Sequence, residues 1–231
     1  MIPLRDHNPR RTFPFITYTL VALNVLAFLW ELSLGAQLER ALFSVAFIPA
    51  RYWLPGNWGF DLATIVISMF LHGGLLHIGS NMLYLWIFGD NIEDRLGHFR
   101  YLIFYLLCGF LAALSQLLLD PGSTVPMVGA SGAIAGVMGA YLVLYPHSRV
   151  LMLFPFPVFL FELPAIVFLG MWFFLQFLNG IGQLPVFQQD QISGGVAFWA
   201  HVMGFITGLV LVVFMKRPER TRVEWWDTIE S

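Results

Sequence analysis

The sequence predicts an all-α integral membrane protein built as a bundle of six transmembrane helices. The chain of 231 residues is 58% hydrophobic and only 11% charged, and its mean hydropathy is +0.74. Soluble domains contain roughly 25% charged residues. Each of six stretches without Asp, Glu, Lys or Arg is long enough for the helix of about 20 residues that a bilayer requires. These stretches are 13–30, 62–89, 101–119, 121–148, 163–189 and 191–215.

We expect the spans to cover about residues 13–33, 74–92, 100–119, 129–146, 163–182 and 196–215. A soluble fold is disfavoured, because it would need six fully buried helices almost without polar faces. The chain has no internal repeat and no low-complexity segment. Residues 1–231 are therefore expected to form one membrane domain, in which 216–231 are a short cytoplasmic tail.

The segments between the spans differ in length and composition. The first outer segment, 34–71, is the longest, and it is rich in aromatic residues of the kind that lie at membrane interfaces. Residues 154–158, Phe-Pro-Phe-Pro-Val, are expected to be irregular or interfacial, because proline removes a helix hydrogen bond. The last outer segment, 181–195, is polar and contains glycine, so we expect a mobile loop.

The basic residues predict the orientation, because cytoplasmic loops carry an excess of Lys and Arg. With the N-terminus inside and six crossings, the outer segments hold only Arg40 and Arg51. We therefore expect both termini in the cytoplasm and the protein in a cell membrane, which is the inner membrane if the source is a Gram-negative bacterium. The cytoplasmic segments then hold Arg5, Arg10, Arg11, Arg95, Arg100, Arg149, Lys216, Arg217, Arg220 and Arg222.

Composition disfavours several other classes of protein. The net charge is −2 and there is no basic run, so no nucleic-acid partner is expected. Cys108 is the only cysteine and falls within a span, so no internal disulfide can form. The first span is long and has no convincing small-residue cleavage site, so a cleaved signal peptide is not expected.

Ser131 and His201 are the candidate catalytic residues. Ser131 lies near the start of the fourth span and His201 roughly five residues into the sixth. Both spans start outside, so at about 1.5 Å per residue both side chains are expected within about 10 Å of the outer surface. A serine and a histidine at the same depth can serve as nucleophile and general base, because the histidine can accept the serine proton.

Glycines on the same two spans favour close packing of the helices that carry these residues, since small residues let membrane helices approach. In the sixth span two glycines follow His201 at i+3 and i+7, on the same face. The alternative is that Ser131 is only a small packing residue. The expected packing glycines are Gly129, Gly132, Gly136, Gly204 and Gly208.

A third cluster lies at the start of the second span. His77 and Asn81 are four residues apart, so they share a helix face, and both can donate hydrogen bonds. Donors near a serine nucleophile suggest an oxyanion hole, which stabilises the charge that develops during acyl transfer. His72 and His77 lie well round a helix from each other, and there is no His-Glu-x-x-His motif. A metal site is therefore disfavoured, and no cofactor is expected.

These motifs resemble those of the rhomboid intramembrane serine proteases over nearly the whole chain. Gly129-Ala-Ser-Gly132 is similar to the family motif GxSG. Residues 72–81 resemble its second-helix motif His-x4-His-x3-Asn, and 200–208 its last-helix motif Ala-His-x2-Gly-x3-Gly. Glu93-Asp-Arg95-Leu-Gly97 is similar to the end of the family's second helix. The resemblance implies the compact six-span form, with Ser131 as nucleophile, His201 as general base, and His77, Asn81 and the Ser131 N–H as oxyanion hole. It also implies a supporting role for His72.

The chain departs from the family pattern in two places. A Trp-Arg pair common in the first loop has no counterpart at Ala63-Thr64, and the position four after the serine, often aromatic and packed on the histidine, is Ala135. Gly129-Ala-Ser-Gly-Ala133 also nearly matches the nucleophile elbow of α/β-hydrolases, but that motif needs a preceding strand and a sheet. We find no carboxylate at the expected depth of His201, so we expect a dyad rather than a triad.

The resemblance implies an intramembrane serine endopeptidase that cleaves transmembrane segments of single-span or multi-span membrane proteins near their extracytoplasmic ends, within the lipid bilayer. The fifth span and residues 181–195 are the expected gate and cap. Two alternatives stay open. One is a rhomboid-like protein that binds membrane clients without cleaving them, although such relatives usually lack the serine or the histidine. The other is a transporter with a histidine proton relay. No particular oligomeric state is predicted.

We expect cysteine labelling to place residues 181–195 outside and both termini inside. In a background with Cys108 replaced, Ser193→Cys should react with a membrane-impermeant maleimide added from the outer side. His147→Cys, in the predicted cytoplasmic segment after the fourth span, should react only after the membrane is permeabilised. Labelling of Ser193→Cys from the cytoplasmic side alone would contradict the predicted orientation.

Overall fold

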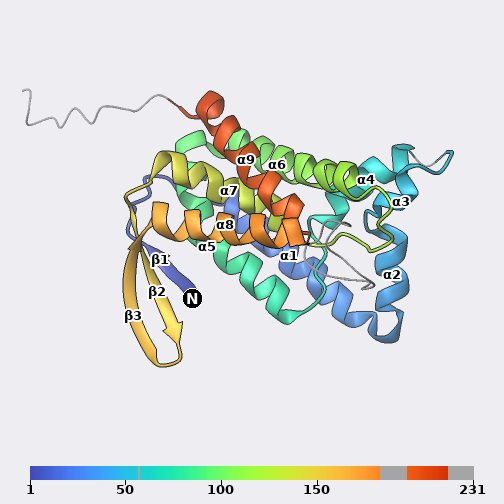
Figure 1. Ribbon diagram of the computed structural model, residues 1–231, viewed down its shortest axis with the longest axis horizontal. Helices are drawn as coiled ribbons and strands as arrows, with labels where there is room; N and C mark the ends of the chain where they lie inside the picture. Colours follow the sequence, from blue (N-terminus) through green and yellow to red (C-terminus); the bar gives the residue numbers. More distant parts are fainter. Residues whose placement is uncertain (57, 183–196, 218–231) are drawn as a thin grey trace, which may run out of the picture.

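The computed structural model describes residues 1–56, 58–182 and 197–217, and these form a helical bundle with a small sheet at one end (Figure 1). In chain order the elements are β1 (Ile2–Asp6), α1 (Phe15–Ser33), the 3-10 turn η1 (Gly35–Gln37), α2 (Leu38–Val45), α3 (Pro49–Tyr52), α4 (Trp58–Ser68), α5 (Leu75–Leu96), α6 (His98–Leu119), α7 (Ser131–Leu144), β2 (Arg149–Pro155), β3 (Val158–Pro164), α8 (Ala165–Gly182) and α9 (Phe198–Met215).

The helices α1, α5, α6, α7, α8 and α9 coincide with the six predicted spans, within a few residues at their ends. Among the described residues, α1, α6, α8 and α9 are long and apolar enough to cross a membrane. Helix α7 has only 14 residues, and α5 carries charged residues near its C-terminus. The chain is a mostly helical membrane protein. That α5 and α7 also cross the membrane stays a prediction.

The bundle has two ends, which we call the Glu93 end and the Ser131 end. At the Glu93 end the starts of α1 and α6 meet the ends of α5 and α9. The contacts include Arg217 N–H donating to the Arg95 carbonyl at 3.1 Å. Eight of the ten basic residues predicted to be cytoplasmic lie in the described segments of this end, and Arg220 and Arg222 lie outside the described residues. Arg40 and Arg51 belong to the segment after α1, toward the Ser131 end.

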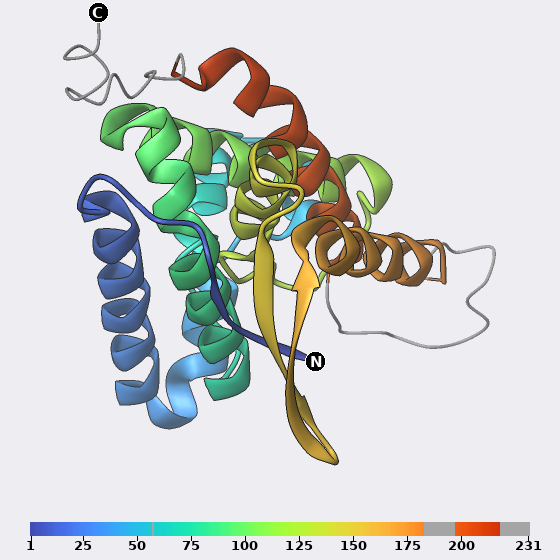
Figure 2. The same cartoon turned by 90° about the vertical axis from the view of Figure 1, so that its left-hand side faces the viewer.

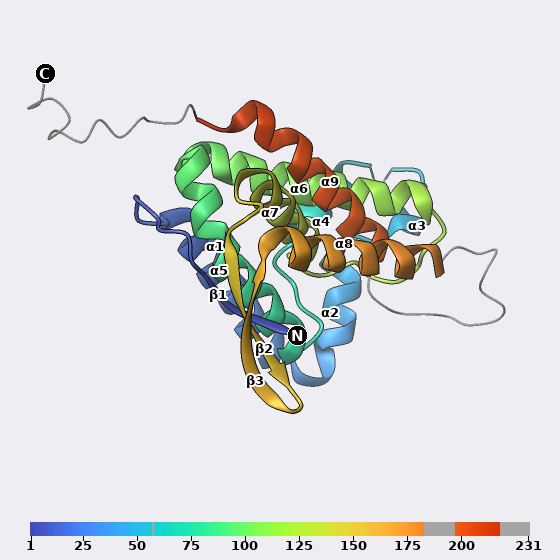
Figure 3. The same cartoon turned by 60° about the vertical axis from the view of Figure 1, so that its left-hand side comes forward.

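Helix α7 lies at the centre of the bundle, between α5, α6, α8 and α9 (Figure 3). Residues 133–141 are all buried, and small residues let the neighbouring helices come close. A Cβ at Gly204 or Gly208 of α9 would overlap the backbone carbonyl of Gly132 or Gly136, respectively. A Cβ at Gly136 would also lie 2.5 Å from the Cys108 side chain of α6. Helices α7 and α9 therefore meet backbone to backbone.

Two carboxylates of α5 hold the start of α1. The Glu93 side chain is fully buried, and it accepts from the Ile16 N–H at 2.8 Å and from the N–H and hydroxyl of Thr17 at 2.7 Å each. Asp94 accepts from the N–H of Thr12 at 2.9 Å and from its hydroxyl at 2.6 Å. The first N–H groups of a helix have no intrahelical acceptor, and negative charge there is favourable. Helix α1 is therefore fixed to α5 at the Glu93 end.

A three-stranded antiparallel sheet in the order β1-β2-β3 lies at the Glu93 end (Figure 2). Residues 154–158, which were expected to be irregular or interfacial, are not irregular. These residues close a hairpin in which Pro155 pairs with Val158 across a turn at 156–157. Proline is excluded from helix interiors but is tolerated at strand ends. Residues 163–164, assigned above to the fifth span, belong to β3 for the same reason.

The sheet is attached to the bundle through a buried polar network. Val150 and Met152 of β2 alternate into the core, as a half-buried strand requires. Asp6 of β1 accepts from the Tyr141 hydroxyl of α7 at 2.6 Å and from Asn91 of α5 at 3.0 Å. Burial raises the pKa of the Asp6 carboxyl despite these donors. The network thus joins Asp6, Asn91 and Tyr141, which are far apart in sequence, near the C-terminal end of α7.

Residues 34–71, the longest of the segments between predicted spans, are folded into short helices. They form η1, α2, α3 and α4 between α1 and α5. Phe47 and Ile65 are buried against Ala113 and Leu117 of α6. This small core supports the part of the molecule that surrounds Ser131. Residues 183–195 of the predicted cap lie outside the described residues.

Gly208→Ala is expected to destabilise the fold by about 1–3 kcal/mol, because the added methyl must push α9 away from the α7 backbone. Gly170→Ala on α8 is the matched control, because a Cβ there has nothing within 4 Å and alanine is the better helix former. Thermal unfolding of the two purified variants in detergent measures the difference. Equal stability would contradict the backbone contact between α7 and α9.

Candidate active site

Ser131 is the first residue of α7, and the N-cap residue Ala130 makes no side-chain cap. Two backbone hydrogen bonds hold the segment before it. Met127 N–H donates to the Phe47 carbonyl at 2.8 Å, and Gly129 N–H donates to the Ser68 carbonyl at 2.9 Å. The first N–H groups of a helix attract negative charge. The hydroxyl of Ser131 therefore lies at the positive end of a helix dipole.

Gly129 has a different role from the helix packing expected of it. It precedes α7, and its φ is +122°. Residues other than glycine rarely adopt this backbone conformation. A Cβ at this position would lie 2.7 Å from Nε2 of His77. Glycine is therefore required both by the backbone and by the closeness of the histidine ring.

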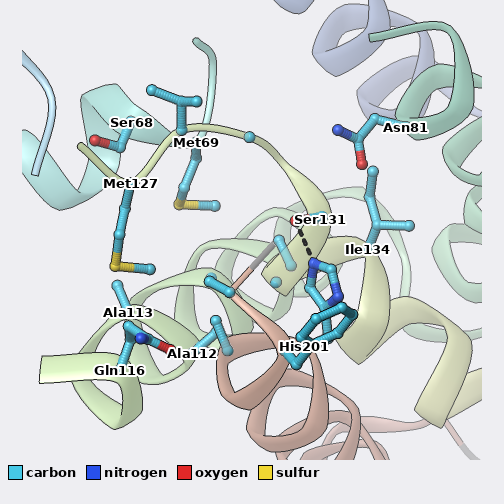
Figure 4. Close-up of a pocket in the computed structure, with 18 of the residues that line it drawn as sticks. Ser68, Met69, Asn81, Ala112, Ala113, Gln116, Met127, Ser131, Ile134 and His201 are labelled. Atoms are coloured by element: carbon cyan, nitrogen blue, oxygen red, sulfur yellow. Dashed lines mark hydrogen bonds between the residues drawn. The ribbon is translucent and has the colours of Figure 1, made fainter. Parts of the chain in front are cut away.

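His201 of α9 contacts Ser131, as their equal expected depth suggested. Its Nε2 lies 2.7 Å from the Ser131 Oγ, and Figure 4 marks this hydrogen bond. The histidine is 9% exposed, and both side chains line the same cavity. At this distance the imidazole can accept the hydroxyl proton if its Nε2 carries no hydrogen.

Aromatic rings flank His201 although Ala135 supplies none. The ring of Trp172 on α8 lies with its centroid 6.0 Å from that of His201, tilted by 33°. Phe198 is nearly perpendicular to the imidazole at 6.4 Å. Gly204 approaches α7 near Ala135, where a Cβ on the glycine would lie 3.4 Å from the alanine methyl. The imidazole is thus confined by α8 and α9 rather than by an aromatic residue of α7.

Gln176 of α8 also contacts His201, although it was not among the predicted site residues. Its Oε1 lies 2.9 Å from Nδ1 of His201, on the side of the ring opposite Ser131. A signal was present, because Gln176 is a polar residue in an apolar helix and follows Trp172 by four positions, on the same face.

The three other predicted residues lie at the same end as Ser131. Asn81 of α5 is buried, and its Nδ2 has no hydrogen-bond partner among the described residues. The side chain points from α5 toward α7 and lines the cavity that contains Ser131 (Figure 4). The His77 ring packs on Gly129. His72 is fully buried, and its ring meets that of His77 edge-on at 5.1 Å. His72 therefore packs against the His77 ring and restricts its position.

Two carboxylates lie at the Ser131 end, contrary to the expectation of none near the depth of His201. Glu31 of α1 is buried and accepts from the backbone N–H of His72 at 2.9 Å. Asp120 follows α6 and lines the same cavity as Ser131. Both nitrogens of His201 have neutral partners in the described structure, so the missed carboxylates do not make a triad.

Ser131 opens into a cavity of about 780 Å³ between α4, α5, α6, α7, α8 and α9. Apolar side chains such as Met69 and Met127 and polar ones such as Gln116 line it (Figure 4). The described residues contain no group of three or more His, Cys, Asp or Glu side chains that could hold a metal ion. The site is therefore a partly polar chamber around one serine–histidine pair.

Comparison with known proteins identifies the family of the chain. The Rhomboid domain family matches residues 59–218, well over half of the chain. Rhomboid protein 1, mitochondrial, of Saccharomyces cerevisiae is 32% identical over 148 residues, covering 62% of this chain and 40% of that protein. Rhomboid protease GluP of Bacillus subtilis is 33% identical over 137 residues, covering 59% and 26% respectively.

Rhomboid protease AarA of Providencia stuartii is 27% identical over 225 residues, covering 90% of this chain and 75% of that protein. The chain spans less than half the length of the yeast and Bacillus proteins that it matches. From the extent of the family match, together with the membrane bundle, the chain belongs to the rhomboid family.

Proposed function

We propose that the chain is an intramembrane serine endopeptidase and that residues 1–231 act as one rhomboid membrane domain. The observation that carries the proposal is the 2.7 Å contact between Ser131 Oγ and His201 Nε2 inside a cavity. The printed names of GluP and AarA, which describe rhomboid proteases, support it. A serine held against a histidine base is the arrangement used for acyl transfer.

In the first half of the reaction Ser131 Oγ attacks the carbonyl carbon of a substrate peptide bond while His201 Nε2 accepts the hydroxyl proton. The tetrahedral intermediate collapses, the C–N bond breaks, and His201 returns the proton to the leaving amine. The acyl-enzyme then reacts with water, whose proton passes to His201 as the new C–O bond forms. The Ser131 ester oxygen leaves and recovers a proton from His201.

The carbonyl oxygen gains negative charge in each half of the reaction. We assign its stabilisation to Asn81 Nδ2, the His77 ring and the Ser131 N–H at the start of α7. The absence of a described partner for Asn81 Nδ2 supports this role, because a buried donor without an acceptor is costly unless it serves a ligand. Donors already in place need little reorganisation when the charge appears.

The substrates we propose are transmembrane segments of single-span or multi-span membrane proteins, cut near their extracytoplasmic ends. With the basic Glu93 end in the cytoplasm, Ser131 faces the outer half of the bilayer. A helical substrate must unwind first, so helix-weakening residues near the cut should help. Helix α8 is our candidate gate, because its buried residues are only Ala165, Phe168, Leu169 and Gly180.

Ser131→Ala and His201→Ala are each expected to lower cleavage of a transmembrane substrate by roughly 10³-fold or more, because the two residues act as one unit. Both should also abolish labelling by a fluorophosphonate. Ser33→Ala is the control, since this exposed serine donates to the Trp30 carbonyl of its own helix. A wild-type protein that neither labels nor cleaves would favour the client-binding alternative, and cleavage by Ser131→Ala would refute the assigned nucleophile.

Asn81→Ala is expected to lower kcat by about 10²–10³-fold, or less where the other donors compensate, with little change in KM or thermal stability. Asn91→Ala on the same helix is the control, because Asn91 bonds to Asp6 across elements and its loss should lower stability instead. Turnover and unfolding are measured on the same preparations. Normal turnover of Asn81→Ala with a lowered melting point would mean that Asn81 is structural.

A further inference from the structure

The two ring nitrogens of His201 have different partners. Nε2 faces the hydroxyl of Ser131 at 2.7 Å, and Nδ1 faces Oε1 of Gln176 at 2.9 Å. A neutral imidazole carries one hydrogen, on one nitrogen or the other. An amide oxygen can only accept, so its contact with Nδ1 requires the hydrogen there. The Nε2 lone pair is then free to accept the serine proton.

We propose that Gln176 is a positioning residue, which holds His201 in the Nδ1–H tautomer and keeps Nε2 directed at Ser131. This inference rests on the proposed function and deepens it. Gln176 stands where other serine or cysteine hydrolases place an Asp, Glu or Asn beside the catalytic histidine. The site is then a serine–histidine–glutamine arrangement on three helices.

A neutral acceptor suits this position better than a carboxylate. The His201 side chain is buried between α7, α8 and α9, where an added charge would be costly. The Gln176 amide orients the ring and sets its tautomer without that cost. Trp172 and Phe198 restrict the ring plane, but their contacts do not distinguish one ring nitrogen from the other.

The placement of Gln176 follows from the pattern of α8. Trp172 and Gln176 are four residues apart, so one face of the helix presents both to His201. The next amide along, on Asn179, instead donates to the Leu175 carbonyl of its own helix at 2.7 Å. The chain therefore offers a matched pair of amides on one helix, only one of which reaches the histidine.

The test compares Gln176→Met, Gln176→Glu and the control Asn179→Leu in purified protein. Methionine keeps the length of the side chain but removes the acceptor, whereas glutamate keeps an acceptor and removes the amide hydrogens. We expect Gln176→Met to lower kcat roughly three- to tenfold with KM unchanged, as for the loss of one neutral hydrogen bond. Gln176→Glu should keep the Nδ1–H tautomer, because its carboxylate still accepts that hydrogen, and Asn179→Leu should keep the full turnover.

The direct readout is the tautomer of His201, measured by ¹⁵N NMR of histidine-labelled protein and assigned by the signals missing from His201→Ala. Wild-type protein should show Nδ1 protonated and Nε2 unprotonated, and Gln176→Met should show both tautomers. An Nε2–H tautomer in the wild type overturns the proposal, even where a variant fails to fold. So does a Gln176→Met protein with normal kcat or with an unchanged single tautomer, or a Gln176→Glu protein that has lost the Nδ1–H tautomer.

The tautomer measurement does not depend on proteolysis. If the wild-type protein neither labels with fluorophosphonate nor cleaves, the proposed function fails while the spectrum still decides whether Gln176 sets the His201 tautomer. If the protein cleaves and the spectrum does not respond to Gln176→Met, the proposed function stands and the positioning role fails.

Discussion

The backbone contact between α7 and α9 is the constraint on which the site depends. Gly204 and Gly208 bring α9 against the carbonyls of Gly132 and Gly136, closer than any side chain would allow. The serine is the first residue of one helix and the histidine is in the first turn of the other, so this contact sets both their depth and their separation. Small shifts of either backbone would lengthen a hydrogen bond whose usefulness depends on its geometry.

The features of the fold and the site that could be predicted are those that depend on residues close together in the sequence. Uncharged stretches locate the helices that match the spans because a bilayer excludes charge, and the spacing of Ser131 and His201 within spans that start on the same side predicts their equal depth. The cluster from His72 to Asn81 is likewise visible, because its members share one short segment. None of these features depends on how the helices are arranged next to one another.

The missed features depend on partners that are distant in sequence. Strand β1 pairs with β2, which lies more than 140 residues later in the sequence, and the apolar hairpin of β2 and β3 was not predicted because its partner strand is so distant. Gln176 was missed because α8 is apolar almost all round, so its sequence does not reveal which face meets α9. Glu31 and Asp120 were not expected near the site because they lie at span ends, where one helical turn decides whether a charge reaches the site.

The buried carboxylate of Glu93 has a consequence for how the protein is made. Helix α1 leaves the ribosome before Glu93 exists, so its first N–H groups can be satisfied only by water at the membrane surface. When α5 has been synthesised and packs beside α1, the Glu93 carboxylate can replace that water and hold α1 against the bundle. We therefore expect an order in biogenesis: α1, an apolar helix long enough to cross a membrane, forms first, and it acquires its fixed place only once α5 has been synthesised.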